Sequence, residues 1–123
     1  MPKKPTHKPR NAGTMTEAAF FGMLRSHLRR LSIRWKPMQL AKQKARVKYA
    51  GENKRRKWSY ECAECKGLFP DTEIAVDHII PCGSLKSFED LGGFAERMFC
   101  EVDCLQILCN ECHLIKSQQE REK

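Results

Sequence analysis

Two Cys-x-x-Cys pairs in the second half of the chain are the residues best suited to chemistry. The first pair is Cys62 and Cys65, and the second pair is Cys109 and Cys112. A single tight turn can present both sulfurs of such a pair to one ion, and four thiolates form a closed tetrahedral cage for zinc. The spacing therefore predicts a structural Zn²⁺ site. The alternative is that the four thiols are merely buried.

An Asp77-His78 step lies between the two pairs, and His113 directly follows the second pair. A cage that already holds four sulfurs has no place for these three residues, so they need another role. Asp77 and His113 can offer an oxygen and a nitrogen to Mg²⁺ or another divalent cation, and His78 can take a proton from water as a general base. The cation would polarise a scissile phosphate, which predicts metal-assisted hydrolysis of a phosphodiester bond. The alternative is a strand that ends in a solvent-facing histidine.

The segments around these residues predict elements that could hold them across a cleft. The β-branched run 74–76 ends at the Asp-His step and, together with residues 58–60, predicts a small β-hairpin. A short helix is expected at 88–98, and a final helix from residue 109 onward would carry the closing histidine in its first turn. A strand end and a helix start, both tied to one zinc cage, would face each other over the three candidate residues.

The first half of the chain has the pattern of two basic helices. Thr14 and Glu17 match a capping box, and apolar residues then recur at helical spacing, which predicts an amphipathic helix over about 14–35. Pro37 suits the first turn of a second helix that would continue to a stop at Gly51.

Charge is distributed unevenly along the chain. Residues 1–60 contain 17 lysines and arginines and two acidic residues, whereas residues 61–123 contain six lysines and arginines and 13 acidic residues. Within the basic half, residues 1–13 lack apolar periodicity and predict a mobile tail, and residues 54–57 predict a basic linker. This distribution favours nucleic acid as the partner, with double-stranded DNA expected. The candidate nucleic-acid contacts are Arg25, Arg29, Arg55, Arg56, Lys57 and Lys116. The alternative is that the helix arginines only flank a packed face and that Lys116 is a solvated helix lysine.

The cysteine content and the hydropathy of the chain indicate in which cellular compartment to expect the protein. Seven cysteines is an odd number, and the chain begins without an apolar signal stretch, so we expect reduced thiols and a cytoplasmic protein. The longest apolar run, residues 18–24, is far shorter than the roughly 20 residues that cross a bilayer, so no membrane is expected. Cys82, Cys100 and Cys104 lack a clear fourth ligand and are interpreted as packed thiols rather than a second metal site.

Two segments, 76–81 and 105–116, resemble the signature of HNH endonucleases of the zinc-containing ββα-metal type, particularly those of bacteriophages. The first segment reads Val-Asp-His-Ile-Ile-Pro, and the second reads Leu-Gln-Ile-Leu-Cys-Asn-Glu-Cys-His-Leu-Ile-Lys. The likeness covers residues 58–118, about half of the chain. It implies that Asp77 and His113 bind the catalytic cation, that His78 is the general base, and that the four paired cysteines hold zinc. It also implies DNA cleavage that leaves a 5′-phosphate and a 3′-hydroxyl.

The chain departs from this family at one position. The middle asparagine, which braces the loop that carries the base, usually lies nine residues before the closing histidine, and here that position is Cys104. Asn110 lies between two zinc ligands and faces another way, so Asp103 is the candidate substitute.

Together these features predict an α+β fold in two parts. Residues 1–57 would form a basic, mostly helical DNA-binding arm with a disordered start, and residues 58–123 would form a small zinc-stapled HNH nuclease domain. The likeness to phage enzymes adds phage DNA-packaging proteins as candidate partners and the host cytoplasm as the location. Two alternatives from other classes stay open: a non-catalytic zinc-dependent DNA-binding or regulatory module, and an RNA-binding zinc protein.

Overall fold

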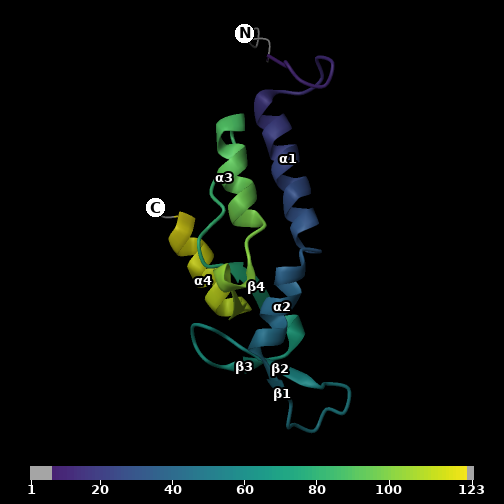
Figure 1. Ribbon diagram of the computed structural model, residues 1–123, viewed down its shortest axis with the longest axis vertical. Coiled ribbons are helices and arrows are strands. Elements are labelled where there is room, and N and C mark those ends of the chain that lie inside the picture. The colour runs from purple at the N-terminus through teal and green to yellow at the C-terminus, as the bar shows by residue number, and fades with distance from the viewer. Residues whose placement is uncertain (1–6, 122–123) are drawn as a thin grey trace, which may run out of the picture.

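The computed structural model describes residues 7–121, and these residues form helices together with two small sheets (Figure 1). This mixture confirms the α+β class. In chain order the elements are α1 (Glu17–Ser32), α2 (Lys36–Ala45), β1 (Arg46–Lys48), β2 (Trp58–Glu61), β3 (Leu68–Phe69), the 3₁₀ turn η1 (Asp71–Glu73), β4 (Ile74–His78), α3 (Phe88–Met98), the 3₁₀ turn η2 (Val102–Cys104), β5 (Leu105–Cys109) and α4 (Asn110–Arg121). Between residues 7 and 121, no helix combines the length and the apolar character needed to cross a membrane.

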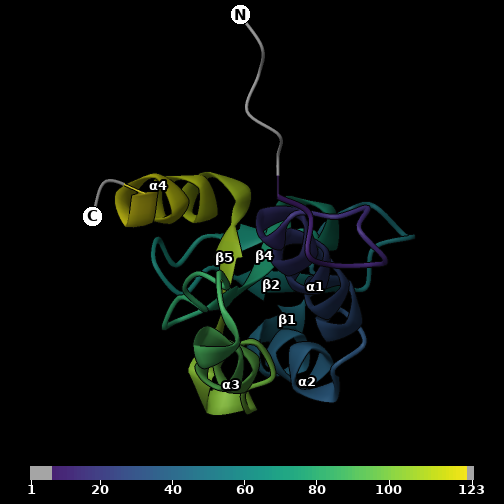
Figure 2. The same cartoon turned by 90° about the horizontal axis from the view of Figure 1, so that it is seen from above.

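A β4-β5-α4 unit holds the residues expected to do chemistry. Strands β4 and β5 pair antiparallel, so that Asp77 lies opposite Gln106 and His78 lies opposite Leu105. Helix α4 begins directly after β5, at Asn110. Figure 2 shows β5 running into α4 beside β4. The connection between β4 and β5 contains α3, which covers the predicted range 88–98.

The strand pairing differs from the predicted hairpin. Strand β2 pairs with β1 on one side and β3 on the other, whereas β4 pairs only with β5. The second helix ends at Ala45 instead of continuing to residue 51, and the chain then enters β1. The short Arg-Val-Lys strand is stabilised by the free edge of β2, and the Arg46 guanidinium stacks 4.0 Å from the centroid of the Trp58 ring. Residues 54–57 therefore lie in the loop between β1 and β2 and are not a linker.

The predicted capping box is also wrong. Helix α1 is capped by Thr16, whose Oγ1 accepts a hydrogen bond from the Ala19 amide at 3.1 Å. Glu17 instead pairs with Arg10 at 2.6 Å, because a turn brings Arg10 back beside Met15. This turn occupies part of the predicted mobile tail, and residues 1–6 of that tail lie outside the described residues.

Three clusters of buried side chains form the core. The first joins α1 to α3, the second joins α2 to β5, and the third surrounds the paired cysteines. Their buried members are Phe21, Leu85, Phe94 and Met98; Ala41, Leu105 and Ile107; and Cys62, Leu108 and Cys109. Helix α2 thus packs against β5, which carries part of the site, and the expected boundary after residue 57 falls between the paired strands β1 and β2.

Candidate metal centre and hydrolytic site

The four paired cysteines come together at one point. Their sulfur atoms all lie within 4.8 Å of one another, and the Cys65 and Cys109 sulfurs are 4.0 Å apart. A zinc ion with Zn–S bonds of about 2.3 Å separates its sulfurs by about 3.8 Å, so the cluster fits a tetrahedral Zn²⁺ after a small contraction. Cys62 is fully buried, whereas Cys65 faces solvent.

Backbone turns shape both halves of the cage. In the first, the Cys62 amide donates to the Gly67 carbonyl at 2.9 Å, and Lys66 adopts a left-handed conformation with φ of 65°. A side chain at Gly67 would place its Cβ 2.8 Å from the Phe69 ring, so the turn requires glycine there. In the second, the amide of Cys112, in the first turn of α4, donates to the Cys109 sulfur.

The pKa values of these thiols diverge. Burial raises the pKa of Cys62, but hydrogen bonds from the backbone amides of Cys109, Cys65 and Glu64 outweigh this and lower it to about 6. The hydrogen bond with Cys109, together with burial, raises the pKa of Cys112 to about 12. Four thiols this close cannot all ionise alone, because each thiolate repels the next. The donor set therefore favours a bound divalent cation.

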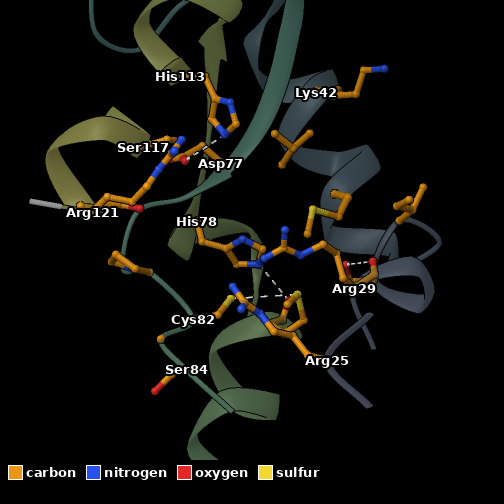
Figure 3. A pocket seen from close by; sticks show the side chains of 18 of the residues that line it. Arg25, Arg29, Lys42, Asp77, His78, Cys82, Ser84, His113, Ser117 and Arg121 are labelled. Atoms are coloured by element: carbon orange, nitrogen blue, oxygen red, sulfur yellow. Dashed lines mark hydrogen bonds and ion pairs between the residues drawn. The ribbon is translucent and has the colours of Figure 1, made fainter. Parts of the chain in front are cut away.

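Asp77 and His113 form the second candidate metal pair. The Oδ1 atom of Asp77, whose residue is 8% exposed, lies 3.7 Å from Nε2 of His113 (Figure 3). Adjacent ligand atoms of an octahedral Mg²⁺ with bonds of about 2.1 Å are about 3.0 Å apart, so the two side chains would hold a shared cation after a small approach.

The other oxygen of Asp77 is already engaged. Its Oδ2 accepts a hydrogen bond from Gln106 at 2.9 Å and lies 2.9 Å from the Lys116 ammonium. Lys116 also donates to the His78 carbonyl at 2.7 Å and pairs with Glu120 at 2.7 Å. Burial lowers the pKa of Lys116, but these carboxylates outweigh it and raise the pKa above the ordinary value. The Lys116 ammonium is thus paired with groups of the protein itself. Its expected contact with a phosphate stays a prediction.

A hydrogen bond from the imidazole ring holds the His78 side chain in place. Its Nε2 lies 2.9 Å from the carbonyl oxygen of Met98, at the end of α3. A carbonyl can only accept a hydrogen bond, so Nε2 carries the hydrogen and Nδ1 is the nitrogen that can take a proton. Sequence reasoning missed Met98, because a main-chain carbonyl leaves no mark in the residue type.

The loop after His78 is braced by the main chain of Cys104. The Ile79 amide donates to the Cys104 carbonyl at 3.0 Å. The Asp103 side chain plays no part in that contact. Any residue at position 104 could supply this carbonyl, so the contact does not depend on the cysteine side chain.

A cleft of about 940 Å³ lies over the site. It is lined by Asp77, His78 and His113 and by cations from α1, and Figure 3 shows Arg25 and Arg29 extending toward His78. The structure therefore brings these two candidate nucleic-acid contacts to the predicted base. Three further candidates, Arg55, Arg56 and Lys57, lie in the β1–β2 loop and do not line the cleft.

Lys42 and Glu120 also line the cleft, and sequence reasoning did not single them out. Lys42 pairs with Asp71, and Glu120 pairs with Lys116.

Comparison of the chain with protein-family models, with curated proteins and with solved structures finds no match.

Proposed function

We propose that this protein is a metal-dependent endonuclease of the HNH type that hydrolyses phosphodiester bonds of double-stranded DNA. One observation carries the proposal. The Met98 carbonyl accepts a hydrogen bond from Nε2 of His78, which leaves Nδ1 free to take a proton, and His78 lines the same cleft as Asp77 and His113.

His78 acts as the general base. Nδ1 takes a proton from a water molecule, and the water oxygen forms a bond to phosphorus while the bond to the 3′-oxygen breaks. The products are a 5′-phosphate and a 3′-hydroxyl, whose oxygen takes a proton from solvent. The Nε2 hydrogen bond to Met98 keeps the ring in place and stabilises the imidazolium that forms.

The remaining residues orient the substrate and hold the cation. Arg25 and Arg29 offer guanidinium groups to the DNA phosphates, because planar forks match phosphate oxygens. Asp77 and His113 would hold a divalent cation, which neutralises charge that builds on the phosphate and the leaving oxygen. A zinc ion held by the four cysteines would fix the start of α4 and so the position of His113.

Plasmid cleavage tests the proposal. Wild-type protein should nick or linearise plasmid in Mg²⁺ or Mn²⁺ and not in EDTA, and His78→Ala should cut about 10²- to 10⁴-fold more slowly with its zinc retained. His27→Ala, at an exposed histidine on α1, is the matched control and should cut at the wild-type rate. Intact plasmid throughout, with zinc and DNA bound, would instead favour the non-catalytic DNA-binding module.

A further inference from the structure

The hairpin formed by β1 and β2 carries a dense group of cations away from the cleft. Residues 46–61 contain six lysines and arginines and two acidic residues. Strand β1 is exposed along its whole length. In Figure 1 the hairpin projects from the lower end of the molecule, below α1, β4 and α4, three of the elements whose residues line the cleft.

Two of these cations hold the hairpin together. Arg56 donates to the Ser59 hydroxyl at 2.7 Å and to the Trp58 carbonyl at 3.2 Å, and it stacks 4.2 Å from the centroid of the Tyr49 ring. The stacked Tyr49 ring also fills the space next to Gly51, where an added Cβ would clash with it. Arg46 packs on Trp58 from the other strand. The loop is therefore shaped by its own side chains.

The other four cations are exposed to solvent and are available to bind a ligand. They are Lys48, Lys54, Arg55 and Lys57. Over residues 7–121 none of the four takes part in an ion pair. Asn53 helps to shape the loop that carries them, since its side-chain oxygen accepts a hydrogen bond from the Arg55 amide at 3.1 Å. An ordered loop that presents four free positive charges binds a polyanion with little loss of conformational freedom.

We propose that the β1–β2 hairpin is a second DNA-binding surface, which contacts the phosphates of duplex DNA beyond the segment in the cleft. This inference rests on the proposed function, from which it takes DNA as the substrate. Strand β3 pairs with Tyr60 and Glu61, so the end of the hairpin from Lys48 and Trp58 outward is a two-stranded ribbon. Such a ribbon fits the major groove of B-form DNA, whereas the deep and narrow major groove of A-form RNA excludes it. The hairpin lengthens the footprint and holds the duplex across the cleft.

The first test compares two triple variants by binding in EDTA to a duplex of about 30 base pairs, or about three helical turns. Lys54→Ala, Arg55→Ala and Lys57→Ala together should weaken binding at least roughly tenfold at low salt and reduce the salt slope by up to about 2.7. The matched control removes three exposed lysines that line neither the hairpin nor the cleft: Lys8→Ala, Lys36→Ala and Lys86→Ala. Equal affinities and slopes for the two variants would overturn the proposal.

The second test uses wild-type protein and needs no substitution. Duplex DNA should slow acetylation of Lys54 and Lys57, measured by mass spectrometry, and leave Lys86 unchanged. Equal labelling of the hairpin lysines with and without DNA would overturn the proposal, and so would stronger protection by duplex RNA. Protein that binds DNA through the hairpin but never cuts plasmid would defeat the proposed function alone, whereas cutting that survives the triple variant with unchanged affinity would defeat this inference alone.

Discussion

Lys116 lies where the candidate base and the candidate metal ligands meet. Its ammonium contacts the Asp77 carboxylate, the His78 carbonyl and Glu120. Because Asp77 is almost fully buried, this charge balances a carboxylate that would otherwise be desolvated without a cationic partner. The same ammonium repels a divalent cation that binds to the other Asp77 oxygen.

Replacement of Lys116 should separate these two effects. Lys116→Met should lower the free energy of unfolding by about 2–4 kcal/mol, because Asp77 keeps only Gln106 as a side-chain donor. It should also enlarge the rise in melting temperature that millimolar Mn²⁺ produces, because the repelling charge is gone. Thermal unfolding in Mn²⁺ and in EDTA measures both quantities, with Lys86→Met as the control. A Mn²⁺ effect no larger than that of wild type would contradict this account of Lys116.

At the scale of elements, the cage ties together segments distant in sequence. Cys62 and Cys65 lie between β2 and β3, Cys109 ends β5, and Cys112 lies in α4. A metal bound there would connect the three-stranded sheet to the strand-helix junction that presents His113. Loss of the metal would free that junction.

Removal of one cage thiol should therefore destabilise the whole protein. Cys62→Ser should retain little zinc and should lower the melting temperature by roughly 15 °C or more, because structural zinc contributes directly to folding. Metal analysis and thermal unfolding measure the two effects. Cys82→Ser, at a thiol outside the cage, is the control. A variant that melts like wild type while lacking zinc would show that the cage does not support the fold.

The elements that sequence could predict are those with a local signature. The β-branched run before Asp77 and the second Cys-x-x-Cys pair before His113 indicated β4 and α4, and the cysteine spacing predicted the cluster of four thiols. Strand β1 could not be foreseen, since Arg46 and Lys48 fit a helix until β2 offers an edge to pair with. Contacts made by main-chain carbonyls, such as those of Met98 and Cys104, could not be predicted either, because every residue type has this carbonyl.

At the scale of the whole molecule, the two halves of the chain share a core. Ala41 from α2 packs with Leu105 and Ile107 from β5. Each buried aliphatic side chain contributes about 1.5–3 kcal/mol, which is a large part of the stability of a small domain. The basic half is therefore structural as well as charged.

Deletion of residues 1–57 should leave a chain that does not fold cooperatively, even with zinc present. The deletion exposes Leu105 and Ile107 and leaves β2 without β1. Circular dichroism and thermal unfolding test this. The full-length hairpin variant is the control, because it loses charge but keeps the packing. A truncated protein with a sharp transition near that of the full chain would show that the second half folds alone.

The packing of α2 on β5 also sets when the fold can form during synthesis. The two partners are Ala41, near the first third of the chain, and Leu105, close to its end. At ribosomal rates of about 5–20 residues per second, β5 is synthesised several seconds after α2, and until then α2 lacks this packing partner. The cysteines at 109 and 112 emerge later still. The basic half thus leaves the ribosome before the four paired cysteines can come together.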